Sequence, residues 1–287
     1  MRILVFGANG MAGHMAGTYL REAGHEIIGY SRTPCECCSQ WVQGDVLDQR
    51  HIRQVLKENK FDAVVNAVGV LNTKVDEDLW EGIYINSAFP HLVAECLKGS
   101  EARLIHISTD CVFSGKEGKY AETSQPDADT YYGRSKALGE VKDDKNLTLR
   151  TSIIGPELKA DGVGLLHWFL NQAGTVSGYQ RVIWSGVTTL ELAKAIEAAI
   201  NQNISGLYHL VNNRWIAKYE LLKLFNKHMR GGQVEIRPDG RVISDKSLIN
   251  TRTDFQYTVP GYEEMIEELA GWMKQHKGLY PLYQAGR

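Results

Sequence analysis

No apolar run in the sequence approaches the ~18 residues that a membrane-spanning helix needs, and no internal repeat or low-complexity segment is present. The chain begins with a short strand-like segment that runs directly into glycines, unlike a secretion signal. Prolines number only 7 and form no linker-like tract. We therefore expect neither secretion nor a membrane span, and we expect no repeat architecture.

Charge of one sign is not in excess, because 32 Lys and Arg residues face 34 Asp and Glu residues for a net charge of -2. A main partner such as nucleic acid or an anionic membrane favours a strongly basic protein. We therefore expect no nucleic-acid or membrane partner. The length of 287 residues favours one large α/β unit or two closely joined lobes.

Cysteine is sparse, with 5 residues, and this odd number excludes complete pairing into disulfides. Three are crowded as Cys35-x-Cys37-Cys38, and no second cluster accompanies them. We interpret all five as reduced thiols of a cytoplasmic protein, with the crowded three in a surface loop. A metal site would need a fourth ligand from Cys96, Cys111 or a histidine, which no spacing indicates, so we predict no metal site.

A glycine-rich turn is the first recognisable pattern in the chain. Residues 2–6 form a continuous apolar run, Gly7-x-x-Gly10-x-x-Gly13 follows, and a helical pattern continues to residue 22. In a dinucleotide-binding turn, these glycines permit the turn, admit a pyrophosphate and let the helix pack closely on the strand. A glycine turn without a ligand is the alternative. The predicted cofactor-binding residues here are Gly7, Asn9, Gly10, Met11 and Gly13.

The second strand, residues 26–30, ends in Ser31-Arg32. An NAD-preferring site would carry a carboxylate at this position for the ribose hydroxyls, whereas an arginine suits a 2'-phosphate. We therefore predict that Ser31 and Arg32 bind the cofactor and that NADP(H) is preferred over NAD(H). A merely solvated Arg32 is the alternative.

Further polar and small residues follow the ends of later strands. Asp45 is placed to accept a hydrogen bond from an adenine amine, and Asp48 is typical of a helix N-cap. Asn86 lies in the helical stretch of residues 79–97, either as a structural cap or in a catalytic role. Ser108 and Thr109 are expected to face the same crevice as the glycine turn. The remaining predicted cofactor-binding residues are Asp45, Val46, Asn66, Ala67 and Val68.

Tyr132 and Lys136 are four residues apart in a helix that is predicted to begin at Thr130. Their side chains therefore share one helix face. A nearby cation stabilises a phenolate and lowers the pKa of the tyrosine, so the pair would serve as a tuned acid or base. An ordinary helix face is the alternative. The acid/base interpretation of the pair is supported by the glycine turn and Thr109 elsewhere in the chain.

The second half of the chain is less regular. Six β/α steps are expected in about the first 150 residues. After Gly155-Pro156 the pattern becomes irregular, and a helix at residues 188–200 and a strand at 206–211 then resume it. Helices are also expected at residues 217–229 and 262–276. The predicted division is residues 1–152 and 187–212 in a cofactor-binding domain, and residues 153–186 and 213–287 in a substrate-binding lobe.

Taken together, these residues resemble the extended short-chain dehydrogenase/reductase family, and most closely its dTDP-4-dehydrorhamnose reductase branch. The resemblance rests on the glycine turn, Asn66, Asn86, Tyr132-x-x-x-Lys136 and the loop from Ser108 to Gly115. In that loop, cysteine replaces an aromatic residue of the family pattern. The likeness is specific in the first 155 residues and thin afterwards. It implies a Rossmann-like doubly wound parallel α/β sheet with a smaller, partly interleaved lobe.

The resemblance also implies a reaction and a role for each catalytic residue. Tyr132 would donate a proton to a carbonyl oxygen while hydride arrives from the nicotinamide. Lys136 would hold the nicotinamide ribose and lower the pKa of Tyr132, and Thr109 would hydrogen-bond the same oxygen. The implied activity is NADPH-dependent reduction of the 4-keto group of a nucleotide-activated 6-deoxy sugar, for surface polysaccharide or deoxysugar biosynthesis. A homodimer is one candidate assembly.

Two alternatives remain open at this point. Nucleotide-sugar epimerases and dehydratases hold NAD tightly, but dehydratases carry an Asp-Glu pair where this chain has Asp110-Cys111, which disfavours elimination. A non-catalytic NADP-binding regulatory subunit is the other alternative. Arg150, Lys218 and Arg252 would each meet a diphosphate or be an ordinary surface charge. The predicted substrate-binding residues are Asp110, Cys111, Trp168, Trp184 and Arg252, and the two tryptophans would stack on a base or sugar or belong to an aromatic core.

Overall fold

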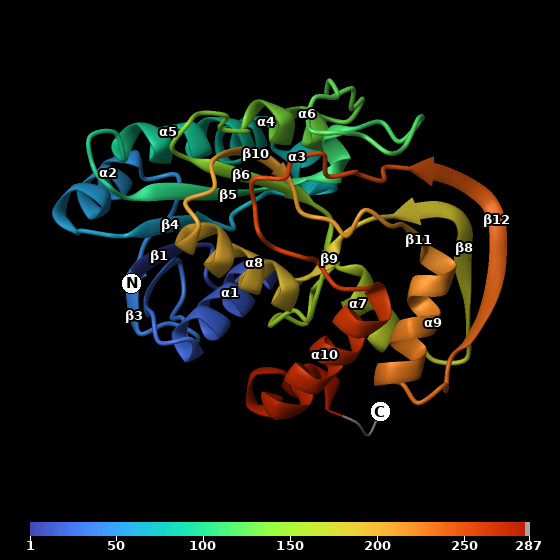
Figure 1. Ribbon diagram of the computed structural model, residues 1–287. Helices are drawn as coiled ribbons and strands as arrows, with labels where there is room; N and C mark the ends of the chain where they lie inside the picture. Colours follow the sequence, from blue (N-terminus) through green and yellow to red (C-terminus); the bar gives the residue numbers. More distant parts are fainter. Residues whose placement is uncertain (285–287) are drawn as a thin grey trace.

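A seven-stranded sheet forms the centre of the protein, whose residues 1–284 are described by a computed structural model (Figure 1). Its strand order is β10-β6-β5-β4-β1-β2-β3, and every neighbouring pair is parallel. Parallel strands covered on both faces are expected to be continuously apolar, as residues 3–6 and 63–65 are. The strands are β1 (Arg2–Phe6), β2 (Glu26–Ser31), β3 (Gln40–Gln43), β4 (Ala63–Asn66), β5 (Arg103–Thr109), β6 (Leu147–Thr151) and β10 (Gly206–His209).

Helices cover both faces of this sheet, which confirms the predicted doubly wound fold. Helices α1 (Met11–Glu22) and α8 (Thr189–Asn201) lie below the sheet in Figure 1, and α2 (Gln49–Glu58) and α5 (Phe89–Cys96) lie above it. Each face has its own apolar core. Between Met1 and Gln284, no helix combines the length and apolar character that crossing a membrane requires.

The helix that carries Tyr132, α6 (Tyr131–Leu138), begins where the sequence predicts. The hydroxyl of Thr130 accepts a hydrogen bond from the backbone N–H of Gly133, which makes Thr130 its N-cap. Asp48 caps α2 in the same way through its carboxylate, which confirms that prediction. Both boundaries follow from local sequence alone.

The helical stretch of residues 79–97 is less regular than the sequence indicates. It consists of α4 (Leu79–Ile83), a π-helical turn η1 (Tyr84–Ala88) and α5, and it is preceded by α3 (Asn72–Glu77). The π-helical turn contains Asn86. Such turns occur often at functional sites because they reposition side chains that a regular helix would direct elsewhere.

A second, smaller sheet lies beside the first and contains β11 (Ile216–Ala217), β8 (Thr175–Trp184) and β12 (Glu235–Asp245) (Figure 1). Strands β7 (Ile153–Ile154) and β9 (Val187–Thr188) form a two-stranded sheet. The chain returns to the central sheet through β10 before it completes the smaller one. The predicted division between two lobes follows this interleaving and stays a prediction; its last range ends at residue 287, beyond the described residues.

The helices of this second part are α7 (Leu165–Leu170), α9 (Lys218–Met229) and α10 (Tyr262–Gln275), close to the predicted ranges. Short 3-10 turns are η2 (Asp110–Val112), η3 (Lys277–Leu279) and η4 (Pro281–Tyr283). Helix α9 packs on β8, and α10 packs on α9. Figure 1 shows these elements grouped on one side of the central sheet.

The expected alternation of strands and helices fails at one step. Strands β2 and β3 pair in parallel, but residues 32–39 connect them without a helix. Parallel neighbours usually need a crossover of a dozen or more residues. This short connection carries Cys35, Cys37 and Cys38, which fill the space beside α1 and β2.

The turn between β1 and α1 depends on two glycines. Gly7 has a φ of 77°, in the region that favours glycine. A Cβ on Gly13 would overlap the carbonyl oxygen of Gly7 and would lie 2.8 Å from its carbonyl carbon. The close approach of α1 to the end of β1 therefore requires glycine at position 13, as the sequence pattern predicts.

We expect Gly13→Ala to lower the free energy of unfolding by about 1–3 kcal/mol, because the added methyl group meets rigid backbone. Gly271→Ala is the matched control, since Gly271 also lies inside a helix but a Cβ there meets nothing within 4 Å. The control should raise the free energy of unfolding by about 0.5–1 kcal/mol. Urea unfolding measures both changes, and equal effects of the two substitutions would contradict this account.

Candidate active site

The glycine turn lies at the point where the strand order reverses. Strand β1 pairs with β2 on one side and with β4 on the other. Crevices outside the carboxyl ends of such strands bind ligands in open α/β sheets. A Cβ on Gly7 would lie 3.1 Å from the backbone of Ala67, so the turns after β1 and β4 are immediate neighbours. The absence of side chains at Gly7, Gly10 and Gly13 leaves a cradle of backbone at the start of α1, which fits a dinucleotide phosphate group.

Asn9 joins this turn to the connection between β2 and β3. Its Nδ2 donates to the carbonyl oxygens of Thr33 and Pro34, at 2.9 Å and 3.0 Å. The hydroxyl of Ser31 donates to Thr33 O at 2.7 Å. Asn9 and Ser31 therefore shape the rim of the crevice through contacts within the protein, and any contact with a cofactor stays a prediction.

Arg32 extends from the end of β2 into solvent, with 75% of its side chain exposed. Its guanidinium lies 4.0 Å from the carboxylate of Asp45. That carboxylate also accepts a hydrogen bond from Leu47 N at 3.0 Å, and Val46 is buried beside it. Both charged groups border the carboxyl end of β2, where a ribose would lie.

Asn66, at the end of β4, is fully buried. Its Nδ2 donates to His106 Nδ1 at 3.1 Å, and its Oδ1 accepts from Val68 N at 3.1 Å. The side chain is thus occupied in holding the turn of Ala67 and Val68 against β5. A direct cofactor contact would come from the backbone of this turn.

Asn86 holds three segments together. Its Oδ1 accepts from Val70 N at 2.9 Å, and its Nδ2 donates to Val70 O at 2.9 Å and to Ser135 Oγ at 3.1 Å. A Cβ on Gly139 would overlap the carbonyl oxygen of Asn86, so α6 approaches η1 closely. These contacts favour the structural role over the catalytic one that the sequence left open.

Thr109, Tyr132 and Lys136 come together between the end of β5 and helix α6. Tyr132 is 8% exposed and Lys136 is 4% exposed. Lys136 Nζ donates to the carbonyl oxygen of Ile107 on β5, at 2.8 Å. The hydroxyl of Thr109 donates to Asp110 Oδ1 at 3.1 Å and accepts a hydrogen bond from Cys111 N at 3.1 Å.

The pKa of Tyr132 differs from the sequence expectation. Burial raises it above the ordinary value, Cys111 raises it further, and the hydrogen bond with Thr109 opposes the shift. Burial also lowers the pKa of Lys136 to about 8, against the charge of Glu140. Burial thus outweighs any lowering of the Tyr132 pKa by Lys136 in the protein alone, and that role of Lys136 stays a prediction. The phenol is protonated at neutral pH, which suits a proton donor.

A buried charged network beneath the site was missed by the sequence analysis. Arg150 is fully buried on β6, and its guanidinium donates to both carboxylate oxygens of Glu140, at 2.6 Å and 2.7 Å. Ser108 Oγ donates to Glu140 at 2.9 Å, and Arg150 donates to His209 at 3.1 Å. Ser108 therefore does not face the crevice, and Arg150 is not free to meet a diphosphate. A charge in the middle of a buried strand was the signal that a partner must exist.

The predicted substrate-binding residues divide into two groups. Asp110 is buried, and its pKa is raised by burial; the pKa of Cys111 is raised to about 11 for the same reason. Both follow Thr109 directly and border the site. Trp168 lies on α7 and is 40% exposed.

The side chains of the other two residues are occupied by contacts within the protein. Trp184 is 5% exposed, donates to Ser152 Oγ at 2.9 Å and packs against Tyr262, so it belongs to the aromatic core. The guanidinium of Arg252 donates to the carbonyl oxygens of Ser205 and Leu207 and pairs with a neighbouring carboxylate. These contacts are at the amino end of β10, at the opposite edge of the sheet from the site. These contacts argue against a substrate contact of Arg252, whereas a substrate contact of Trp184 stays a prediction.

Two of the three crowded cysteines are buried rather than surface thiols, and Cys38 is partly exposed. Cys35 and Cys37 are 8% and 3% exposed, and their sulfur atoms lie 2.8 Å apart. Cys37 Sγ donates to Ala8 O in the glycine turn, at 3.4 Å. Hydrogen bonds from the other two thiols lower the pKa of Cys35, and the contact with Cys35 raises the pKa of Cys37.

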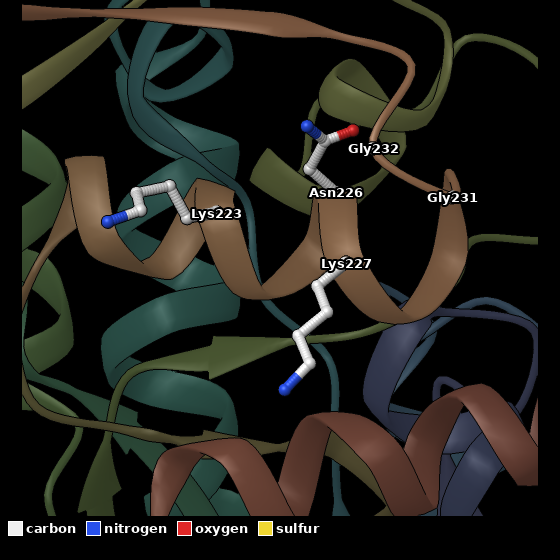
Figure 2. Close-up of a pocket in the computed structure, with 5 residues that line it drawn as sticks. All are labelled: Lys223, Asn226, Lys227, Gly231 and Gly232. Atoms are coloured by element: carbon white, nitrogen blue, oxygen red, sulfur yellow. The ribbon is translucent and has the colours of Figure 1, made fainter.

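A separate open hollow of about 530 Å³ lies on α9, away from the sheet edge. Figure 2 shows Lys223, Asn226 and Lys227 on this helix, with Gly231 and Gly232 after it, and the two ammonium groups pointing apart. Each ammonium is paired with a carboxylate, Lys223 with Glu220 and Lys227 with Glu263. The hollow therefore does not gather chemistry comparable to that around Tyr132.

Comparison with known proteins agrees with this geometry. Residues 1–241 match the family described as RmlD substrate binding domain. The chain belongs to this family. The resemblance to the dTDP-4-dehydrorhamnose reductase branch of the extended short-chain dehydrogenases/reductases is thereby confirmed.

This RmlD-family protein is 31% identical over 235 residues to a probable low-salt glycan biosynthesis reductase, Agl14, of Haloferax volcanii, covering 74% of this chain and 75% of the relative. It is 23% identical to the dTDP-4-keto-6-deoxy-D-glucose reductase of Streptomyces niveus, covering 99% and 98%. Its fold is similar to that of the dTDP-4-dehydrorhamnose reductase of Bacillus anthracis in complex with NADP, with a TM-score of 0.78, 20% identity and coverage of 93% and 98%.

His14, on α1 of this RmlD-family protein, gives the stability a predictable pH dependence. It is fully buried, its Nδ1 donates to Gly10 O at 2.9 Å, and its Nε2 lies 3.1 Å from the hydroxyl of Tyr280. Burial lowers its pKa from 6.5 to about 4. The folded state therefore binds fewer protons than the unfolded state between these values.

We expect the free energy of unfolding to fall as pH drops from 6.5 to 4, with up to about 3 kcal/mol from His14 alone. His14→Asn retains an amide donor near Gly10 O but does not titrate. Urea unfolding is measured at several pH values in this range. The free energy of unfolding should depend less steeply on pH for the variant than for the unaltered protein, whatever the stability of the variant at pH 7. Parallel slopes for the two proteins would refute the assignment to His14.

Proposed function

We propose that this protein is an NADPH-dependent reductase of the 4-keto group of a nucleotide-activated 6-deoxy sugar. The observation that supports this most is the grouping of Thr109, Tyr132 and Lys136 at the carboxyl end of β5, on the same edge of the parallel sheet as the glycine turn after β1, with the phenol of Tyr132 protonated at neutral pH. The names of the relatives from Haloferax volcanii and Streptomyces niveus, both reductases, agree with it. A nucleotide-linked sugar is the proposed substrate partner.

The residues present fit a dinucleotide cofactor. The backbone of Gly7, Gly10 and Gly13 would hold the pyrophosphate at the start of α1, and Arg32 would hold a 2'-phosphate. Lys136 would hold the nicotinamide ribose. When bound, NADPH supplies the hydride that a carbonyl carbon accepts.

The remaining chemistry belongs to the side chains. The Tyr132 hydroxyl would donate its proton to the carbonyl oxygen of the sugar, and the neighbouring Thr109 hydroxyl would stabilise the charge that develops there. The burial of Tyr132 excludes water, which strengthens both interactions. The ammonium of Lys136, held by Ile107 O, would stabilise the tyrosinate that remains.

Cys111 favours this reaction over elimination. It occupies the position where related dehydratases carry the second carboxylate, and burial raises its thiol pKa to about 11. A neutral thiol does not accept a proton from a sugar carbon as a carboxylate does. Stoichiometric oxidation of NADPH per sugar separates reduction from epimerisation or dehydration, which regenerate their cofactor.

The direct assay combines purified protein with NADPH or NADH and 4-keto sugars linked to dTDP, UDP or GDP. We expect one NADPH oxidised for each keto group reduced. Product formation without net NADPH consumption would indicate an epimerase or dehydratase. NADPH binding without turnover on any of these sugars would instead indicate the regulatory alternative.

We expect Tyr132→Phe to lower turnover by about 10²–10⁴-fold, because the proton donor is lost. NADPH affinity should change little. The matched control is Tyr131→Phe, since the neighbouring Tyr131 is 53% exposed and points to solvent. Steady-state kinetics and NADPH titration measure the two effects. Unchanged turnover in Tyr132→Phe would exclude it as the donor.

Replacing Arg32 tests the cofactor preference. We expect Arg32→Ser to weaken NADPH binding by roughly 10-fold or more, because a charge-assisted contact with the 2'-phosphate is lost. NADH, which lacks that phosphate, serves as the internal control and should bind equally to both proteins. Fluorescence titration with each cofactor provides the comparison. An equal loss of affinity for both cofactors would assign Arg32 a general structural role.

A further inference from the structure

The sulfur atoms of Cys35, Cys37 and Cys38 form a compact triangle. All three lie within 4.8 Å of one another, with 2.8 Å between Cys35 and Cys37 and 3.5 Å between Cys37 and Cys38. All are free thiols, and even the shortest separation exceeds the ~2.05 Å of a disulfide bond. Three sulfurs bound to one ion at ~2.3 Å lie roughly 4 Å apart. The observed triangle therefore needs only small side-chain movements to hold one ion.

Glycines on both neighbouring elements make room for the triangle. A Cβ on Gly17 of α1 would lie 3.2 Å from Cys37 Sγ and 3.6 Å from Cys38 Sγ. A Cβ on Gly29 of β2 would lie 3.2 Å from Cys35 Sγ and would overlap Cys38 Sγ. Cysteines that merely fill a core as small apolar groups do not need to gather their sulfurs at one point.

The short connection that carries the cysteines is fixed from both sides. Arg21 on α1 donates to the carbonyl oxygen of Glu36 at 2.8 Å. Asn9 donates to Thr33 O and Pro34 O at the other end. The triangle is thus held in place by contacts that do not involve the sulfurs, which is the preorganisation that a ligand site requires.

We propose that Cys35, Cys37 and Cys38 form a three-thiolate site for Zn²⁺. Sulfur ligands select thiophilic ions such as Zn²⁺ over Mg²⁺, Ca²⁺ and Mn²⁺. Binding replaces the thiol protons, which pass to solvent, with bonds to the ion and changes no oxidation state. Zn²⁺ with three protein ligands keeps a fourth position for water, and Cys38 at this site is partly exposed to solvent.

The site would act on the edge of the cofactor crevice without being part of the catalytic group. Cys37 Sγ donates to Ala8 O in the glycine turn, and Arg32 begins the connection that carries the cysteines. This connection takes the place of the crossover helix that usually joins parallel neighbours, and a bound ion would restrict its motion further. The proposal does not depend on the proposed function, because it concerns binding of Zn²⁺ alone.

The test uses the full chain, depleted of metal and kept reduced with a phosphine. Zn²⁺ is titrated in competition with a coloured zinc chelator, and Co²⁺ is added separately to detect thiolate-to-metal charge-transfer bands. We expect one equivalent of Zn²⁺ with a dissociation constant tighter than about 1 µM, and sulfur-to-cobalt bands in the near ultraviolet. Cys37→Ser should weaken binding by at least roughly 100-fold.

Cys96→Ser is the matched control, since Cys96 is a partly exposed thiol on α5 outside the triangle. It should bind Zn²⁺ as the unaltered protein does. Cys38→Ser provides a second variant should Cys37→Ser fail to fold, and it should lose the bands and the increase in melting temperature that Zn²⁺ produces. The proposal is overturned if the unaltered protein binds no Zn²⁺ or binds it with a micromolar or weaker dissociation constant. It is also overturned if Cys37→Ser or Cys38→Ser binds Zn²⁺ as tightly as the unaltered protein, or if Cys96→Ser loses as much Zn²⁺ affinity as these variants.

Discussion

The amide of Asn86 joins the segments on which the candidate active site depends. It pairs with both backbone groups of Val70 after β4 and donates to Ser135 on α6. Ser87 adds a 2.7 Å hydrogen bond to the carbonyl oxygen of Ser135. These contacts form because the π-helical turn directs the buried Asn86 inward. The position of α6, and hence of Tyr132 and Lys136 relative to the sheet, follows from this polar joint rather than from apolar packing alone.

Features encoded by neighbouring residues were predictable from the sequence. The glycine turn, the N-caps at Asp48 and Thr130, and the helix near residues 188–200 each depend on a few adjacent positions. Features that depend on distant positions were not. Ser108 and Arg150 meet only because β5 and β6 pair in the register that places them side by side. The upward shift of the Tyr132 pKa likewise results from burial, which cannot be read from the neighbouring sequence.

The smaller sheet shows the same limit. Strand β12 was not predicted, since Pro238 and Gly240 interrupt its pattern and its register shifts after Asp239. It is stabilised by parallel pairing with β8, about sixty positions earlier in the chain. For Trp184 the sequence left open stacking on a substrate or a place in an aromatic core. The fold places it among core residues, where its indole N–H finds Ser152.

The return of β10 to the central sheet has a consequence for the order in which the protein assembles. β10 pairs with β6, from Gly206 opposite Leu147 to His209 opposite Arg150. During synthesis, β6 therefore remains an unpaired edge strand until the ribosome has produced the intervening residues and β10. During that interval Arg150 lacks its hydrogen bond to His209, whereas its partner Glu140 has already been synthesised. Completion of the central sheet is thereby tied to translation of residues 152–205, and a nascent chain that stalls within them exposes a strand edge to aggregation or to chaperones.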